Sequence, residues 1–195
     1  VVTRGTLVER DVDVLAEMAA MGLAQVGITV TTLDAGLARK LEPRAPSPAR
    51  RLKMIATLAQ AGVPVRVNVS PIIPGLSDDG IEAVMAAARD AGAVRASWVM
   101  LRLPFEVSEL WRDWLATHYP DRAGKVMARL RDMHGGRDYA PDWGHRMRCE
   151  GHYAQMIAHR FKLAQRRLGL DADLPELRTD LFRVPPRAGD QLSLF

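Results

Sequence analysis

The sequence predicts an α/β protein with parallel strands, and three observations predict it. Three segments repeat one order of elements: an apolar helical pattern, a glycine, and then a β-rich run. The glycines Gly22, Gly62 and Gly92 each stand where a helix ends in a left-handed residue, and they are 40 and 30 residues apart, about one βα unit. No short turns of the kind that antiparallel hairpins need separate the β-rich runs. Parallel strands joined by crossover helices are therefore expected.

Two capping residues predict where helices of this repeat begin. Asp11 precedes an apolar helical pattern that begins at Val12, and Ser77 precedes a second one that contains Ile81 and Val84. Asp and Ser are favoured N-caps because their side-chain oxygens accept hydrogen bonds from the free N–H groups of the first turn. We expect one helix to be capped by Asp11 and another by Ser77.

The β-rich runs alternate apolar and polar residues. A parallel strand covered by helices on both faces is normally apolar throughout. The alternation therefore indicates either a barrel whose polar lumen holds a ligand or a sheet with one solvated face. The expected helix-facing positions are Val26, Ile28 and Val30, then Val65, Val67 and Val69, then Val99, Leu101 and Leu103.

After Pro104 the pattern becomes helical and then irregular. Helices are expected at 108–119, at 122–133 and at about 153–168, the last ending at Gly169. The predicted division is residues 1–104 for the β/α part, 105–170 for a basic helical extension and 171–195 for an irregular tail. The apolar stripes of the three helices are Leu110, Trp111, Trp114 and Leu115; Val126, Met127, Leu130 and Met133; and Met156, Ile157, Phe161 and Ala164.

Composition narrows the class of protein. Apolar residues make up 48% of the 195 residues, which suits a packed core, and no apolar run is long enough to span a membrane. The single cysteine, Cys149, excludes an intramolecular disulfide and favours a reducing, cytoplasmic location. His145 lies four residues before Cys149, but a structural zinc site usually needs more thiolates, so we predict no metal site. Because the chain begins at Val1 and not at Met, we expect it to be a fragment.

Five short motifs resemble the radical S-adenosylmethionine (SAM) superfamily when taken in order. VVTRG is similar to the third-strand motif of that family, ITVTTLD to the fourth strand, RVNVSPIIPGLSDDGIE to the fifth strand and its loop, and WVMLRLP to the sixth. KLEPRAPSPARRL resembles the branch that contains spore photoproduct lyase and its bacterial relatives. The resemblance covers residues 1–170, most firmly 25–103.

The resemblance implies the C-terminal half of a six-stranded partial (β/α) barrel of the TIM type, with its site at the carboxyl ends of the strands. It also implies SAM and a 4Fe–4S cluster, whose chemistry produces a 5′-deoxyadenosyl radical that abstracts hydrogen. The cluster needs three cysteines spaced CxxxCxxC. This chain has one cysteine, so we expect the cluster motif to precede Val1 and the fragment alone to be inactive.

The resemblance also carries over residue by residue to a set of cofactor-pocket residues. Each has an ordinary structural alternative, such as a surface arginine, a strand-forming threonine or an internal ion pair. Arg4 would pair with the SAM carboxylate, Thr29 or Thr31 would bond the ribose, Asn68 and Ser70 would approach the adenosine, and Arg102 would reach the cofactor or a substrate phosphate.

Two features of the C-terminal region point to macromolecular partners. Residues 122–167 hold 11 Lys or Arg against 4 Asp or Glu, with aromatic residues between them, which suits nucleic acid but also an ordinary solvated basic face. The chain ends QLSLF, which matches the pentapeptide by which bacterial repair proteins dock on the replication sliding clamp. In that reading Gln191, Leu192, Leu194 and Phe195 bind the clamp; otherwise the tail folds back on its own domain.

Three functions stay open at this point. The leading one is part of a radical SAM enzyme that acts on nucleic acid or a DNA lesion, as spore photoproduct lyase does. The second is an iron-free β/α-barrel enzyme that binds a phosphorylated or sugar ligand. The third is a module without catalysis that binds DNA or the sliding clamp.

Overall fold

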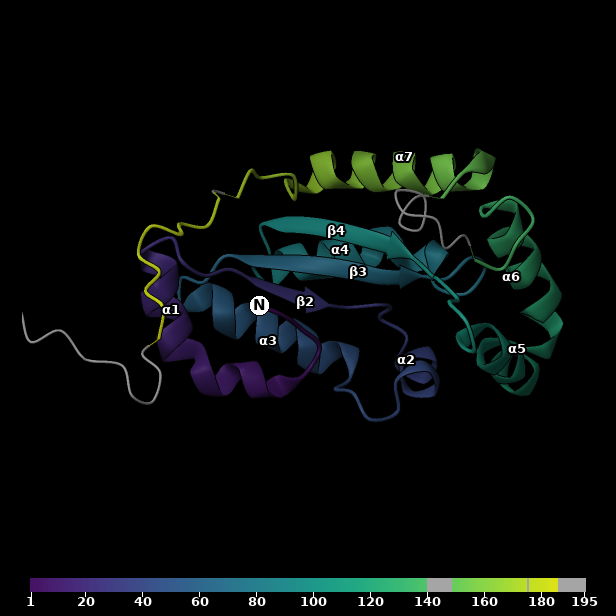
Figure 1. Cartoon of the computed structure of the whole chain (residues 1–195), viewed down its shortest axis with the longest axis horizontal. Helices are drawn as coiled ribbons and strands as arrows, with labels where there is room; N and C mark the ends of the chain where they lie inside the picture. Colours follow the sequence, from purple (N-terminus) through teal and green to yellow (C-terminus); the bar gives the residue numbers. More distant parts are fainter. Residues whose placement is uncertain (140–148, 175, 186–195) are drawn as a thin grey trace, which may run out of the picture.

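The computed structural model describes residues 1–139, 149–174 and 176–185. Its centre is a four-stranded sheet with the order β1-β2-β3-β4, in which every neighbouring pair is parallel (Figure 1). The strands are β1 (Val2–Thr3), β2 (Val26–Thr29), β3 (Val65–Ile72) and β4 (Arg95–Met100). The predicted α/β class with parallel strands is confirmed, and the arrangement is consistent with part of a TIM-like barrel.

Helices lie between the strands as the repeat predicts. They are α1 (Val12–Ala20), preceded by a 3₁₀ turn (Thr6–Asp11), then α2 (Ala35–Leu41), α3 (Pro48–Gln60) and α4 (Ile81–Asp90), the last preceded by the turn Asp78–Gly80. The three capping glycines have φ of 74°, 79° and 102°, so the left-handed helix ends read from the sequence are present. Each glycine ends the helix that leads into the next strand.

The two predicted N-caps are not formed. Asp11 lies at the junction of the 3₁₀ turn and α1, and its side chain makes no capping hydrogen bond. The Ser77 hydroxyl instead accepts from the Ile73 N–H at 2.9 Å, so it closes the loop after β3, and α4 begins after Gly80. The predicted start of α1 is correct, since the helix begins at Val12 directly after Asp11, but the capping bond is absent. The Ser77 prediction was wrong because the 3₁₀ turn Asp78–Gly80, which pattern alone does not reveal, separates Ser77 from α4. Side-chain N-caps form at two other helices: Asp34 caps α2 and Ser47 caps α3, each by accepting hydrogen bonds from backbone N–H groups of the first turn.

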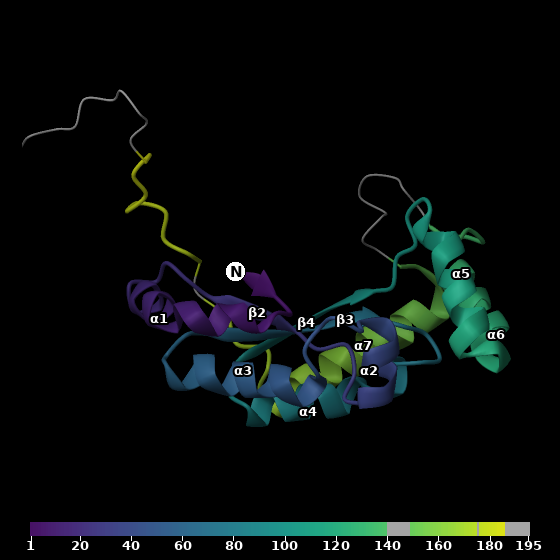
Figure 2. The same cartoon turned by 90° about the horizontal axis from the view of Figure 1, so that it is seen from below.

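The hydrophobic core lies between the sheet and a layer of helices on one face. Figure 2 shows α3, α4 and α7 on the same side of the sheet. The odd-numbered valines of β3 point to this layer and are almost fully buried, as are Val26 and Ile28 of β2. The opposite face carries the polar side chains of the same strands.

The predicted faces of the third run are reversed in β4. Ala96 and Met100 are buried on the helix side, and the Trp98 ring lies 5.9 Å from the ring of Phe161 on α7. Ser97 faces the other way, because its hydroxyl bonds to Asn68 across the sheet. The run SWVMLRL is apolar at both phases of a two-residue period, so alternation alone could not set its face.

The C-terminal helices are α5 (Val107–His118), α6 (Pro120–Asp132) and α7 (Gly151–Leu168), close to the predicted ranges. In Figures 1 and 2, α5 and α6 stand beyond the carboxyl ends of the strands, while α7 runs beside β4 and packs on α4. Beyond α7, Leu170 accepts a hydrogen bond from Ala96 of β4, and Arg178 bonds to Gly22. One core cluster includes residues from both sides of Pro104.

Two apolar residues of the predicted stripes are exposed. Met156 is 44% exposed and Leu110 is 64% exposed. The buried face of α7 consists of Ala154, Ile157, Phe161 and Ala164. Met156 precedes Ile157 by one residue and therefore points about 100° away from that residue around the helix. The stripe of α6 is buried as predicted.

Asp138 ties α5 and α6 together. It accepts hydrogen bonds from Ser108 Oγ at 2.6 Å and Arg131 Nε at 2.8 Å, and it also binds Arg112. Burial raises the pKa of Asp138, but the bonds from Ser108, Arg131 and Arg112 outweigh it and bring the pKa down to about 2. The ionised carboxylate is therefore the form that stabilises this corner of the molecule.

This predicts a loss of stability in acid. A carboxyl whose folded pKa lies below its ordinary value of 3.8 stabilises the fold above that value and loses the effect as the pH falls toward 2. The free energy of unfolding of Asp138→Asn should therefore be lower than that of the native chain at pH 6, and the difference should shrink between pH 4 and 2. Urea denaturation measures it, with exposed Asp113→Asn as the control. If the free energies of unfolding of Asp138→Asn and the native chain differ by the same amount at pH 6 and at pH 2, the prediction is contradicted.

Candidate functional site

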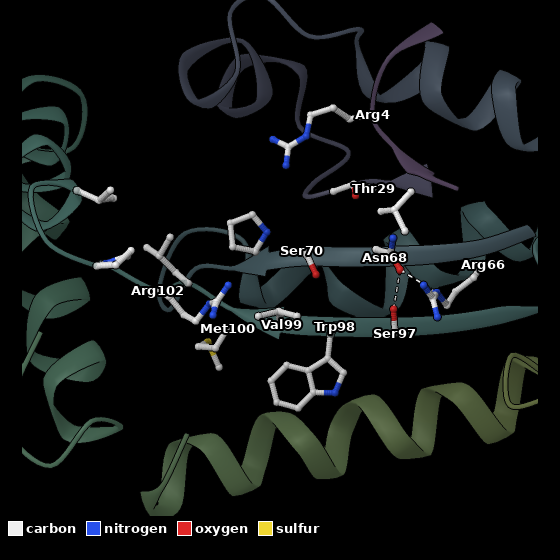
Figure 3. Close-up of a pocket in the computed structure, with 15 residues that line it drawn as sticks. Arg4, Thr29, Arg66, Asn68, Ser70, Ser97, Trp98, Val99, Met100 and Arg102 are labelled. Atoms are coloured by element: carbon white, nitrogen blue, oxygen red, sulfur yellow. Dashed lines mark hydrogen bonds between the residues drawn. The ribbon is translucent and has the colours of Figure 1, made fainter. Parts of the chain in front are cut away.

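A pocket of about 780 Å³ lies on the polar face of the sheet, opposite α3 and α4. Side chains from the end of β1, from β2, β3 and β4, and from the segment that leads to α5 line it (Figure 3). The lining consists of Val2, Arg4, Thr29, Arg66, Asn68, Ser70, Pro71, Ser97, Trp98, Val99, Met100, Leu101, Arg102, Pro104 and Val107. Parallel strands bring these side chains together because their polar faces are in register across the sheet.

Five of the six predicted cofactor residues line this one pocket: Arg4, Thr29, Asn68, Ser70 and Arg102. Thr31 is the exception. It is 4% exposed, and its hydroxyl donates to the Ser70 carbonyl oxygen at 2.8 Å. Thr31, which follows β2, therefore bonds the end of β2 to β3, while Thr29, the last residue of β2, lines the pocket. The roles of the five residues toward a cofactor stay predictions.

Asn68 is the centre of a polar network on the pocket floor. Its Oδ1 accepts from Arg66 Nε at 3.1 Å and from Ser97 Oγ at 2.6 Å. Arg66 and Ser97 were not among the predicted site residues. The alternation of Arg66, Asn68 and Ser70 along β3 was a signal that could have identified Arg66, whereas Ser97 was hidden by the reversed face of β4.

A buried arginine holds the pocket wall near Arg4. Arg51 of α3 is 2% exposed and donates to the Thr29 carbonyl at 3.1 Å and to the Pro46 carbonyl at 2.9 Å. It also binds Glu42, which binds Arg4 through its other oxygen. Arg4 thus already has a carboxylate partner, and an incoming carboxylate would compete with Glu42. The segment KLEPRAPSPARRL supplies both Glu42 and Arg51, so it shapes the pocket from outside.

The loop after β3 is anchored by the C-terminal helices. The Gly75 N–H donates to Asp78 Oδ1 at 2.7 Å, and the Tyr153 hydroxyl of α7 donates to Asp78 Oδ2. Arg129 of α6 lies 3.8 Å from Asp78 and 4.5 Å above the Tyr153 ring. Burial, followed by the hydrogen bond to Asp78 and its charge, raises the pKa of the Tyr153 phenol. The helices therefore hold the Pro71–Gly75 loop beside the pocket.

Several basic residues of 122–167 have carboxylate partners. Arg160 forms two bonds to Glu82 of α4, at 2.9 and 2.7 Å, and Arg131 binds Asp138. These two arginines and Arg129 therefore bind carboxylates of other segments of the chain and hold those segments together. Lys125, Lys162, Arg166 and Arg167 are exposed and remain as candidates for a polymer. Nucleic-acid binding by this region stays a prediction.

Among the residues that the structure describes, no group of three or more His, Cys, Asp or Glu side chains could hold a metal ion. Cys149 Sγ lies 3.9 Å from His134 Nε2, and burial raises the pKa of the Cys149 thiol while Arg102 opposes this. His145 lies outside the described residues, and so do Gln191, Leu192, Leu194 and Phe195 of the predicted clamp motif. None of the helices in the described ranges has the length and apolar character that crossing a bilayer would require.

The chain has a parallel β/α fold with a polar pocket on one face of its sheet, as the resemblance to radical SAM enzymes predicts. Comparison with known proteins supports this class. The family model of the Radical SAM superfamily matches residues 1–88. These residues supply β1 to α4, and with them most of the strands that line the pocket. The resemblance to the radical SAM superfamily that the sequence predicts is therefore confirmed for this part of the chain.

Several individual proteins are similar to parts of this chain, and the length of the similar part differs among them. Uncharacterized protein Rv2578c of Mycobacterium tuberculosis is 29% identical over 143 residues, which are 72% of this chain and 41% of that protein. Uncharacterized protein MJ0683 of Methanocaldococcus jannaschii is 32% identical over 78 residues, 40% of this chain and 29% of that protein. Uncharacterized protein ORF301 of Acidianus two-tailed virus is 40% identical over 72 residues, 37% of this chain and 23% of its own length. The chain thus spans about two fifths of its mycobacterial relative.

Proposed function

We propose that the chain is part of a radical SAM enzyme and that its pocket holds the nucleoside portion of SAM. The observation that carries this proposal is that Thr29 and Ser70, from the segment that matches the superfamily, line one pocket with Arg102, which lies beyond that segment. Ligands of parallel α/β folds bind at the carboxyl ends of the strands. Thr29 is the last residue of β2, and Arg102 follows the end of β4.

The lining fits a nucleoside. The pocket is large enough for one, hydroxyl groups of Thr29 and Ser70 suit ribose hydroxyls, and Pro71 and Leu101 offer apolar contact to a base. When bound, SAM supplies the adenosyl group from which the chemistry of the family starts. The 4Fe–4S cluster does not fit this chain, since the sequence contains one cysteine.

Action on a nucleic acid, as by spore photoproduct lyase, is the finer part of the proposal. The resemblance of KLEPRAPSPARRL to that branch and the exposed basic residues of α6 and α7 support it. The family match favours radical SAM chemistry over an iron-free barrel enzyme or a module without catalysis.

Thr29→Val should weaken binding of S-adenosylhomocysteine, a stable probe for the nucleoside, by about tenfold, because a ribose hydroxyl would lose its partner. Isothermal titration calorimetry of the purified chain measures the affinity. The matched control is Thr117→Val on α5, whose hydroxyl does not line the pocket and donates to the Asp113 carbonyl of its own helix. Failure of the native chain to bind the probe, or equal binding by Thr29→Val, would refute the proposed nucleoside site.

A further inference from the structure

We propose that the outer face of α7 binds the phosphate backbone of a nucleic acid. The inference deepens the proposed action on a nucleic acid and rests on it, because it names the surface that would hold the polymer. The outer face lies opposite the buried face of the helix. Its polar residues, all exposed, are His152, Gln155, His159, Lys162 and Arg166.

The other sides of α7 make contacts within the molecule. One flank binds α4 and the turn before it, through Arg160 and the Tyr153 hydroxyl. The opposite flank binds β4, because Gln165 Nε2 donates to the Ala96 carbonyl oxygen at 2.9 Å. The side between these flanks that faces the core is Ala154, Ile157, Phe161 and Ala164. The outer face therefore remains for a partner outside this chain.

The outer face carries a straight row of basic side chains. His152, His159 and Arg166 follow one another at intervals of seven residues, which is close to two helical turns, and Lys162 lies between the last two. The row is about 21 Å long, since each residue adds about 1.5 Å along the axis. A row of N–H donors of this length reaches several successive phosphates, and phosphate contacts supply much of the affinity of proteins for nucleic acids.

The charge of this row is not compensated. The sequence of α7 contains no Asp or Glu. In the part of the chain that the structure describes, Lys162 and Arg166 form no ion pair, whereas Arg160 binds Glu82 and Arg167 acts on the same carboxylate through its charge. Lys162 and Arg166 are therefore the cations of α7 that are available to an anionic partner.

α6 is less suited to the same role. Its Arg129 and Arg131 lie against carboxylates of other segments. Asp121 and Asp132 are exposed on the same helix as Lys125, so they offset its charge. The basic surplus of residues 122–167 thus reaches the surface most coherently on α7.

The row lies next to one wall of the pocket. α7 runs beside β4, whose Ser97 and Trp98 line the pocket, and the Trp98 ring lies between β4 and α7, 5.9 Å from the ring of Phe161 (Figure 3). Lys162 precedes Gln165 by three residues, so it lies toward the flank of α7 that binds β4. A nucleic acid on the row would therefore pass beside the pocket in which the nucleoside of SAM is proposed to bind.

Two other anionic partners fit this face less well. A helix that binds an anionic membrane inserts its apolar face into the bilayer, but the apolar face of α7 is buried in the core. The exposed apolar residues Met156 and Leu163 are two isolated side chains. An acidic protein segment would pair with the cations, but it has no base to present to the pocket.

Binding of fluorescein-labelled oligo-dT to the purified chain, measured by fluorescence anisotropy, tests the surface. The double variant Lys162→Gln, Arg166→Gln should weaken binding by about tenfold, because two phosphate contacts are lost. The slope of log K against log salt concentration should fall in magnitude by about 1.4, since each contact with a single strand contributes about 0.7. A purely structural role of the two residues would leave this slope unchanged.

The charge-matched control is the double variant Arg44→Gln, Lys53→Gln, which removes two exposed cations before and on α3. Its affinity for oligo-dT should stay within about twofold of the native value. Both double variants should unfold at the native urea midpoint, because all four side chains are exposed. Equal affinities of the two double variants, or an unchanged salt slope, overturns the proposed surface.

Competition identifies the partner and separates this inference from the proposed function. Displacement of oligo-dT by polyglutamate or by phosphatidylserine vesicles at equal charge concentration overturns the assignment to nucleic acid. S-adenosylhomocysteine should bind Lys162→Gln, Arg166→Gln as tightly as the native chain, because neither residue lines the pocket. If the native chain fails to bind S-adenosylhomocysteine, the nucleoside site is refuted, while binding of oligo-dT that depends on Lys162 and Arg166 still supports the α7 surface.

Discussion

Replacing Arg51 by alanine is expected to lower the free energy of unfolding by about 3 kcal/mol. Arg51 is almost fully buried and bonds to the carbonyl oxygens of Pro46 and Thr29 and to the Glu42 carboxylate. Its removal leaves two acceptors without their donor and leaves Glu42, itself largely buried, with Arg4 as its remaining cation. The cost is therefore that of breaking a buried, hydrogen-bonded ion pair.

The adjacent residue Arg50 is the matched control. It pairs with Glu9, but its side chain is 38% exposed, so Arg50→Ala should cost much less than Arg51→Ala, because water screens an exposed ion pair. Urea denaturation of both variants gives the two values. Equal losses for the two arginines would contradict the structural role assigned to Arg51. Because Arg51 binds the carbonyl of Thr29, its loss should also weaken the binding of S-adenosylhomocysteine more than the loss of Arg50 does.

Phe161→Ala is expected to destabilise the protein by about 3–5 kcal/mol. Phe161 is 1% exposed on α7 and packs against the Trp98 ring on the helix-facing side of β4. The substitution removes an aromatic ring from a closely packed layer, which leaves a cavity that the neighbouring helix and strand cannot fully close. The loss should be visible as a lower midpoint in thermal or chemical unfolding.

Met156 on the same helix provides the comparison. It is 44% exposed, so Met156→Ala should change the free energy of unfolding by about 0.5 kcal/mol or less. A small effect of Phe161→Ala, similar to that of Met156→Ala, would mean that α7 does not share the core of the sheet. A large effect in a single unfolding transition would mean that α7 and the β/α part unfold together.

Much of the candidate site could be predicted from the sequence because strand residues two apart share a face. That rule placed Asn68 and Ser70 together, and the parallel repeat brought Thr29 of β2 beside them. It did not apply to β4, where Trp98, Val99, Met100 and Leu101 are all apolar and either face could have been buried. Ser97 was missed for this reason. Of the two threonines proposed for the ribose, Thr29 lines the pocket, whereas the hydroxyl of Thr31 has a backbone partner, the Ser70 carbonyl.

The polar side-chain contacts between different elements could not be predicted at all. Arg51 and Glu42 lie in the segment KLEPRAPSPARRL, which was known only by its family resemblance, and Asp78 and Tyr153 are 75 residues apart. The basic surplus of residues 122–167 was visible, but its partners on α4 and in the loop after β3 were not. A count of charges therefore overstated how much of this region is available to a partner.

The sequence by itself determined the order of the elements, the parallel direction of the strands and the left-handed ends of α1, α3 and α4. These features depend on local rules, the period of the apolar residues and the backbone freedom of glycine at positive φ. The tertiary structure alone decided which face of β4 is buried, which arginines are paired inside the molecule, and that Arg66, Asn68 and Ser97 line one pocket. Those outcomes depend on contacts between residues far apart in the chain, where packing and the need to satisfy buried polar groups override local pattern.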